Sequence, residues 1–377
     1  MGSAIFKTSL TSFYAITRYG CPAATYTQLY HLAYCLRMVS MSHSEVSPPA
    51  SYSDYVPDIL GEGFEQLTIT PADSPDYEGP VFSTLVRHPA DVPTTRAVLY
   101  VHGFNDYFFQ RELALTYGAH EFNFYALDLR KYGRSIRSHQ RPNNVRDLRE
   151  YFYDLDAALA RIREEGNTTI VLSGHSTGGL IISLYLWYRK EKISVAAVVL
   201  NSPFLEMHQP WLLRRLGIPL MKRLGAKWPD MKLKTNLSPI YGESLHHSFQ
   251  GEWDYNLEWK PNQVFSMNAG WLRAIRWGHA QIRRALGIEA PILVLHSDRT
   301  ARRGHREDVF ETDVVLNVAH IRELAPWLGH RVTTHALEGA IHDVFLSREK
   351  VRAEAYRVLF EWLGRVLSPP LARPQAA

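Results

Sequence analysis

The segment 169–186 constrains the possible fold more than any other part of the sequence. It reads TIVLSGHSTGGLIISLYL, which is a β-rich run, a Gly-rich turn and an apolar stretch of helical character. The turn has the pattern G-x-S-x-G, in which the central Ser176 takes a strained backbone conformation and projects above the sheet edge. Gly174 and Gly178 lack a Cβ, so the strand and the helix can pass close to the serine on both sides. The pattern is short, but its strand-turn-helix context predicts that Ser176 is a nucleophile.

Apolar runs of the kind found in buried parallel strands recur along the chain and alternate with helical patterns. The segments 66–70 and 81–87 alternate apolar and polar residues instead, as antiparallel edge strands do. A helical pattern covers residues 148–165. This alternation predicts an α/β fold with a mostly parallel, doubly wound sheet. The predicted buried strands are 97–101, 122–129, 169–172, 195–200, 292–295 and 332–337.

A serine nucleophile needs a base that accepts its proton and an acid that orients the base. In parallel sheets such groups gather at the carboxyl ends of the strands. His342 follows the run 332–337 and is the predicted base, and Asp298 follows the run 292–295 and is the predicted acid. The loop after Asp298 is long and highly charged, so Asp308 and Asp313 stay open as alternative acids.

Five segments resemble the α/β-hydrolases of the monoacylglycerol lipase, lysophospholipase and serine-aminopeptidase-like branch, over roughly residues 64–366. The resemblance implies the α/β-hydrolase fold and the chain order Ser, Asp, His, with no cofactor. It also implies an oxyanion hole made by the backbone N–H groups of Phe104 and Thr177. Lys131 departs from the D-x-R-G-x-G-x-S signature of this branch, since it stands where the first Gly is usual. The matching segments are VHG at 101–103, DLRKYGRS at 128–135, GHSTGG at 174–179, the Asp298 loop and GAIHD at 339–343.

About 90 residues separate the run 195–200 from the run 292–295, which is too long for a crossover connection. We expect a helical cap at 204–270, inserted between strands 6 and 7, and hydrolase core parts at 51–203 and 271–377. The cap is rich in large apolar side chains, most of which should form its own small core. A lid of this kind over a serine favours an acyl chain as substrate. The predicted pocket residues are Phe108, Phe109, Trp211 and Trp253.

The composition argues against several other classes of protein. The net charge is only +4, with acids and bases interspersed, so neither nucleic acid nor an anionic membrane is an expected partner. Residues 1–50 contain no segment that is long and apolar enough to cross a bilayer, and we expect no stable membrane insertion. Cys21 and Cys35 are the only cysteines, so we predict no disulfide framework and a reducing compartment. The histidines show no metal-ligand spacing, and we predict no metal site.

Residues 1–50 differ in composition from the rest, with frequent Ser, Thr and Tyr and no acid before Glu45. We expect a poorly ordered arm, or translated sequence upstream of a start at Met41. Its scattered basic residues leave organelle targeting open beside a cytoplasmic location.

Taken together, these features predict a serine carboxylic-ester hydrolase that acts through an acyl-enzyme. The expected substrate is a small hydrophobic ester, such as a monoacylglycerol or a lysophospholipid. A peptidase, lactonase, thioesterase or acyltransferase stays open, because the fold and the triad do not choose the leaving group. A non-catalytic binding protein with this fold is the alternative from another class. The sequence predicts no oligomeric state.

Overall fold

The computed structural model describes residues 50–72, 76–207, 225–233, 238–301 and 307–368. The predictions for residues 1–49 and for Trp211 lie outside these ranges.

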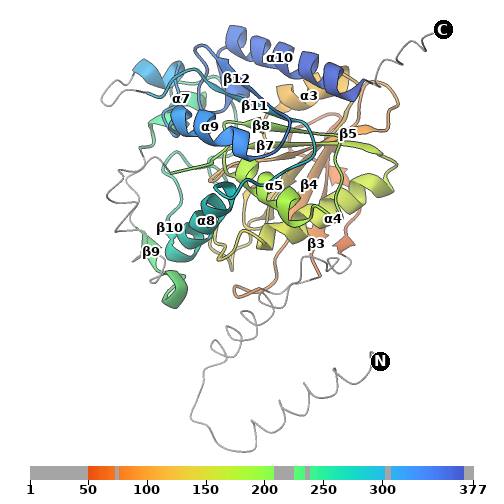
Figure 1. The fold of residues 1–377 in the computed structure, drawn as a ribbon. Helices are drawn as coiled ribbons and strands as arrows, with labels where there is room; N and C mark the ends of the chain where they lie inside the picture. The colour runs from red at the N-terminus through yellow and green to blue at the C-terminus, as the bar shows by residue number, and fades with distance from the viewer. Residues whose placement is uncertain (1–49, 73–75, 208–224, 234–237, 302–306, 369–377) are drawn as a thin grey trace, which may run out of the picture. The chain divides into compact units, whose positions relative to one another are not determined.

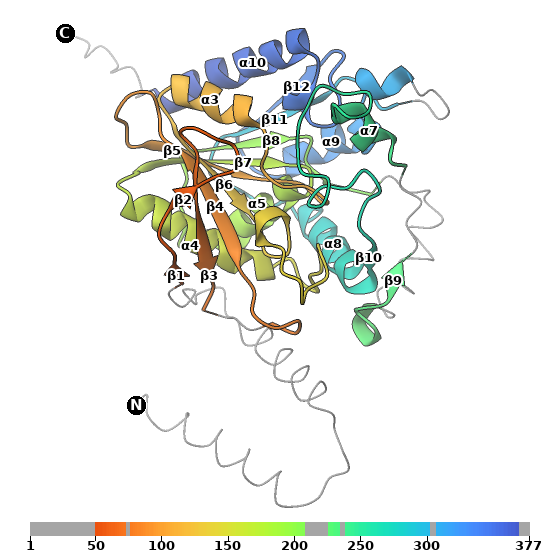
Figure 2. The same ribbon diagram turned by 180° about the vertical axis from the view of Figure 1, so that it is seen from behind.

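A ten-stranded sheet forms the centre of the fold (Figures 1 and 2). Its strand order is β1-β3-β4-β6-β5-β7-β8-β11-β12, and β2 pairs with β3. Pairing is antiparallel from β1 to β6 and parallel from β6 to β12. The strands are β1 (Ser51–Tyr52), β2 (Val56–Pro57), β3 (Glu65–Thr70), β4 (Ser83–His88), β5 (Arg96–Val101), β6 (Asn123–Asp128), β7 (Thr169–His175), β8 (Ala197–Asn201), β11 (Ile292–Ser297) and β12 (Val332–Leu337).

The predicted α/β-hydrolase fold with a mostly parallel sheet is confirmed. Every predicted strand is present, and the largest shift of an end is at β7, which continues to His175 instead of ending at 172. This extension arises because both neighbours pair with it, β5 at Gly174 and β8 at His175. Every residue of β8 and β11 is buried, as the continuous apolar runs predicted for strands covered on both faces.

Helices cover both faces of the sheet (Figure 1). On one face lie α3 (Arg111–Ala119) and α10 (Glu349–Leu367), and their apolar side chains share one core cluster with the sheet. The other face carries α4 (Glu150–Glu164), α5 (Thr177–Tyr188), α8 (Ala269–Ile282) and α9 (Val318–Leu324). The predicted helix 148–165 is α4. The connections between these elements contain the short 3-10 helices η1 (Gly133–Ser135), η3 (Glu307–Phe310), η4 (Ala325–Trp327) and η5 (Val344–Leu346).

The chain between β8 and α8 forms the insertion, which we call the cap. Its described part contains α7 (Ile240–Leu245) and a two-stranded ribbon of β9 (Lys232–Leu233) and β10 (Met267–Asn268), joined by extended loops. Asn268 then begins α8, because its side chain accepts a hydrogen bond from the backbone N–H of Trp271. The returning helix α8 packs against α5, the helix that follows Ser176.

The two ends of the cap are tied together by one buried carboxylate. Glu206, at the start of the cap, is 3 % exposed and accepts hydrogen bonds from Arg276 (2.5 Å) and Arg283 (2.9 Å) of α8. Burial raises the pKa of the Glu206 carboxyl, but interactions with His279, Arg283 and Arg276 outweigh burial and lower it to about 2. Glu206 therefore stays ionised and holds the entry of the cap against its exit.

Replacing Glu206 with glutamine is expected to lower the free energy of unfolding by about 2 kcal/mol at pH 7, because the negative charge and one of the two acceptor oxygens that face the arginines are lost. The folded-state pKa lies below the unfolded value of about 4.3, so the difference from wild type persists above that pH and disappears as the pH falls towards 2. Urea denaturation at pH 7 and pH 3.5 measures the loss of stability and its dependence on pH. The control is Glu361→Gln, which breaks an exposed pair with Arg357. Equal losses for the two variants would contradict this role.

Candidate active site

Ser176 lies in a strained turn between β7 and α5. Its φ of 51° and ψ of −115° are unusual for a residue with a side chain. The backbone N–H of Ser176 donates to the carbonyl of Asn201 at the end of β8, over 2.9 Å. A Cβ added to Gly178 would lie 2.3 Å from the carbonyl oxygen of Val101, and one on Gly174 would lie 2.9 Å from the carbonyl carbon of Gly178. Both positions therefore require glycine for the turn to close.

Three side chains that are far apart in the sequence form a hydrogen-bonded chain. His342 Nε2 lies 3.0 Å from Ser176 Oγ, and His342 Nδ1 lies 2.8 Å from Asp313 Oδ2. Asp313 is fully buried, and its other oxygen accepts from the backbone N–H groups of Val315 (2.8 Å) and Leu316 (2.7 Å). With an ionised carboxylate as acceptor, the proton of a neutral imidazole lies on Nδ1, which leaves Nε2 free to accept from the serine hydroxyl.

The prediction that Asp298 is the acid beside His342 is wrong. Asp298 follows β11, but its carboxylate accepts from the backbone N–H of Gly339 (3.2 Å) in the turn after β12. The chain leaves β11, makes the long charged loop and returns, so that the N–H of Asp313 donates to the carbonyl of Arg299. The returning segment thus brings Asp313 to the end of the strand. The length and charge of this loop were the sequence signal that kept Asp313 open as an alternative.

The loop after β5 lies directly against the serine. A Cβ on Gly103 would lie 3.2 Å from the Cβ of Ser176. Leu129 N–H donates to His102 Nε2, so the proton of His102 lies on Nδ1 and is donated to the carbonyl of Gly103 (2.8 Å). Through these two hydrogen bonds, His102 stabilises the loop after β5. Among the described residues, the N–H groups of Phe104 and Thr177, the predicted oxyanion donors, have no protein acceptor.

The departure at Lys131 has a local explanation. Lys131 has a φ of 66°, a conformation for which glycine is the usual residue. Its fully buried ammonium group lies 2.5 Å from Asp76 and 2.9 Å from Glu78. Two carboxylates from the loop between β3 and β4 therefore compensate the buried charge and hold that loop against the signature segment.

A pocket of about 320 Å³ opens over Ser176 and reaches from the sheet edge into the cap. Its polar side chains include Asp106 and Lys260, which form a 2.6 Å ion pair across the boundary between core and cap. Burial raises the pKa of the Asp106 carboxyl, but Lys260 outweighs burial, and the pKa lies below its ordinary value. The apolar lining comprises Phe104, Phe204, Met207, Ile240, Val264, Met267, Trp271, Val314, Val315 and Leu316.

The predicted pocket residues that the structure describes do not line this pocket. Phe108 is fully buried and packs against Phe124 on the sheet face of α3 and α10. Phe109 packs against the ring of Tyr255, and Trp253 donates its indole N–H to a backbone carbonyl at 346 (3.0 Å). All three side chains pack in hydrophobic clusters, and none of them lines the pocket. Sequence reasoning found the aromatic character of the site but not which face each ring occupies.

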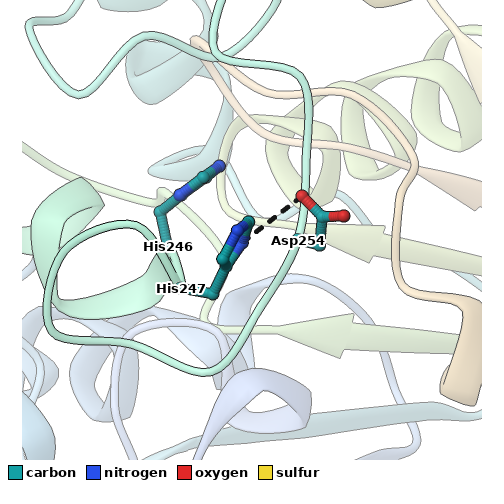
Figure 3. A group of neighbouring side chains, drawn as sticks. All are labelled: His246, His247 and Asp254. Atoms are coloured by element: carbon teal, nitrogen blue, oxygen red, sulfur yellow. Dashed lines mark ion pairs between the residues drawn. The ribbon is translucent and has the colours of Figure 1, made fainter.

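Within the described ranges, one group of side chains has the composition of a metal site, namely His246, His247 and Asp254 in the cap (Figure 3). Figure 3 shows the ion pair between His247 and Asp254, which measures 3.4 Å. His246, however, uses both ring nitrogens, since Nδ1 accepts from the N–H of Ser248 and Nε2 donates to the carbonyl of Tyr255. A metal ion would have to displace these hydrogen bonds. The group does not fit a metal ligand set.

A family model described as "Serine aminopeptidase, S33" matches residues 93–350, which is most of the chain and includes all three members of the hydrogen-bonded chain. The chain belongs to this family of α/β-hydrolases. No curated protein sequence gives a significant match. No helix in the described ranges combines the length and the apolarity needed to span a membrane.

Solved structures with the same fold include lipases and esterases. The monoacylglycerol lipase of Paleococcus ferrophilus is 23% identical, with 75% of this chain and 99% of that chain covered and a TM-score of 0.57. A soluble variant of monoglyceride lipase from Saccharomyces cerevisiae, in complex with a substrate analogue, is 15% identical, with 88% and 99% covered and a TM-score of 0.58. A thermostable carboxyl esterase from Bacillus coagulans is 15% identical, with 82% and 100% covered and a TM-score of 0.56. At these identities the similarity describes the fold.

The geometry predicts opposite results for two conservative substitutions. Asp313→Asn should slow the labelling of Ser176 by a fluorophosphonate on the order of 10³-fold or more, because the amide no longer fixes the imidazole tautomer. Asp298→Asn should leave the labelling rate nearly unchanged. Time-resolved labelling of the two variants, with unfolding curves to verify that each is folded, measures this. A slower rate for the Asp298 variant than for the Asp313 variant would contradict the assignment.

Proposed function

We propose that this protein is a serine hydrolase that cleaves an uncharged carboxylic ester with a single acyl chain, such as a monoacylglycerol. One observation carries the proposal, namely the hydrogen-bonded chain Ser176–His342–Asp313 at the floor of a mostly apolar pocket. The intact chain also argues against a non-catalytic binding protein, because a binder would not need a serine, a base and an acid in this order.

In the proposed mechanism Ser176 Oγ attacks the ester carbonyl while His342 Nε2 accepts the hydroxyl proton. Asp313 stabilises the resulting imidazolium. The backbone N–H groups of Phe104 and Thr177 donate to the developing oxyanion. His342 then returns the proton to the leaving alcohol as the C–O bond breaks, which leaves an acyl group on Ser176. A water molecule, deprotonated by His342, repeats the attack and releases the carboxylic acid and the free serine.

The apolar lining supports an acyl chain as the main binding element. Phe104 and Trp271 pack together with ring centroids 4.4 Å apart, and Met267 and Leu316 line the same cavity. Burial of an acyl chain contributes about 0.8 kcal/mol for each methylene removed from water. A volume of about 320 Å³ lies at the lower end of the usual range for ligand pockets, and this favours one chain over the several chains of a triacylglycerol.

The polar side chains of the pocket support an uncharged leaving group. Asp106 is the only acidic residue among those described in the lining, and Lys260 already neutralises it. Burial lowers the pKa of His175, so this ring is neutral at pH 7. The lining residues that the structure describes therefore offer no surplus charge to bind the α-ammonium group of a peptide or the headgroup of a lysophospholipid. The monoacylglycerol lipases among the similar structures are consistent with this substrate class.

The test is a hydrolysis panel run on wild type and on Ser176→Ala. The panel contains p-nitrophenyl esters of increasing chain length, a monoacylglycerol, a lysophosphatidylcholine and an aminoacyl p-nitroanilide. We expect hydrolysis that depends on Ser176, a kcat/KM that rises with chain length until the pocket is filled, and a clear preference for monoacylglycerol over lysophosphatidylcholine.

Several outcomes would contradict the proposal. Faster cleavage of the anilide than of the esters would indicate a peptidase, and acyl transfer to added alcohol in preference to water would indicate an acyltransferase. If Ser176 in folded protein failed to react with a fluorophosphonate, a binding function would be favoured.

A further inference from the structure

The oxyanion loop, residues 102–108, is anchored to the core at its two ends. At the start, His102 connects Gly103 to the chain after β6 through the two hydrogen bonds described above. At the far end, Phe108 N–H donates to Asp128 (2.9 Å), and Arg134 donates to the carbonyl of Phe108 (2.9 Å). The proposed oxyanion donor, Phe104, lies between these two anchors.

The middle of the oxyanion loop is held by the cap. The side chain of Asn105 donates from Nδ2 to the carbonyl of Pro261 (3.0 Å) and accepts at Oδ1 from the N–H of Phe265 (3.0 Å). The next two residues make cap contacts of their own, since Asp106 pairs with Lys260 and the hydroxyl of Tyr107 accepts from the N–H at 256 (2.7 Å). Consecutive residues of the loop are thus joined to a single strap of the cap, residues 256–265.

Asn105 is distinctive among these residues because its backbone is constrained as well as its side chain. Its φ of 53° lies in the left-handed region, which asparagine tolerates better than most residues. Asn105 is 7 % exposed, so water contributes little to its hydrogen bonds. Because Asn105 directly follows Phe104, fixing its backbone limits how far the adjoining peptide group can turn.

We propose that Asn105 is a positioning residue that uses the cap to hold the N–H of Phe104 in the geometry that binds the oxyanion. The inference rests on the proposed function. It makes the cap part of the catalytic apparatus, because a movement of the strap 256–265 would also move the oxyanion donor. Loss of the two hydrogen bonds between the Asn105 side chain and the cap should therefore weaken transition-state stabilisation more than it weakens binding of the acyl chain.

The test is Asn105→Gly, which accepts the positive φ and removes both side-chain hydrogen bonds. Asn143→Gly is the matched control, because Asn143 is buried, has a φ of 61° and lies outside the pocket lining. Three quantities are measured for each variant: kcat and KM for a short-chain ester, affinity for an alkyl trifluoromethyl ketone that forms an oxyanion, and affinity for an alkanol that does not. Fluorophosphonate labelling rates are recorded alongside.

For Asn105→Gly we expect kcat to fall by about 10- to 100-fold, which is less than the 10²- to 10³-fold loss of removing a donor outright, with little change in KM. Affinity for the ketone and the labelling rate should fall in parallel, while alkanol affinity and the behaviour of Asn143→Gly stay close to wild type. Asn105→Asp accepts from Phe265 but cannot donate to Pro261. Its kcat should therefore lie between those of wild type and Asn105→Gly. It also provides the test if the glycine variant does not fold.

An unchanged kcat and labelling rate for both Asn105 variants would overturn the inference. So would equal losses of ketone and alkanol affinity, which would indicate a general structural role. If wild type reacts with the fluorophosphonate but hydrolyses no ester, the ester function fails, and the labelling rates and ketone affinities still decide the role of Asn105. If wild type does not react at all, both proposals fail.

Discussion

The close approach of β7, the turn at Ser176 and α5 is the constraint on which the rest of the site depends. A positive φ at a serine is unfavourable and persists only where the surroundings allow no alternative. Here the surroundings are the carbonyl groups at the end of β5, which leave no room for a side chain at Gly178, and the carbonyl of Asn201, which accepts from the serine N–H. The same packing places the first N–H groups of α5 beside the loop that follows β5. One tight turn therefore presents the hydroxyl and aligns the proposed oxyanion donors.

The proposed base and the proposed acid reach this turn from loops of very different length. His342 follows β12 after a short Gly-containing turn, and the next residue, Asp343, fixes that turn through Asn201 (2.6 Å) and Gln110 (3.2 Å). Asp313 arrives by a long excursion after β11 and is held by backbone N–H groups. The carboxylate therefore accepts from the backbone on one oxygen and lies against the imidazole on the other, and this fixes its orientation.

Sequence reasoning identified the strands, the turn at Ser176 and the histidine that lies beside it, because each of these depends on local patterns and on the rule that functional groups gather at strand ends. It selected Asp298 instead of Asp313 because Asp298 follows the strand directly in the sequence. The sequence does not show that the chain returns to the same strand end at Asp313. Phe108 was misplaced for a related reason: two successive phenylalanines reveal an apolar segment but not which ring faces a cavity. The hydrogen bonds between Asn105 and the cap have a sequence separation of about 160 residues, and no local pattern encodes them.

The most direct measurement is the site and extent of carbamoylation by an alkyl aryl carbamate, which acylates a serine nucleophile but deacylates slowly. Intact-protein and peptide mass spectrometry are run in parallel with residual activity. The account predicts one carbamoyl group per chain, carried by Ser176, with activity lost in proportion to its occupancy. Label on another residue, or full activity with Ser176 fully occupied, would contradict it.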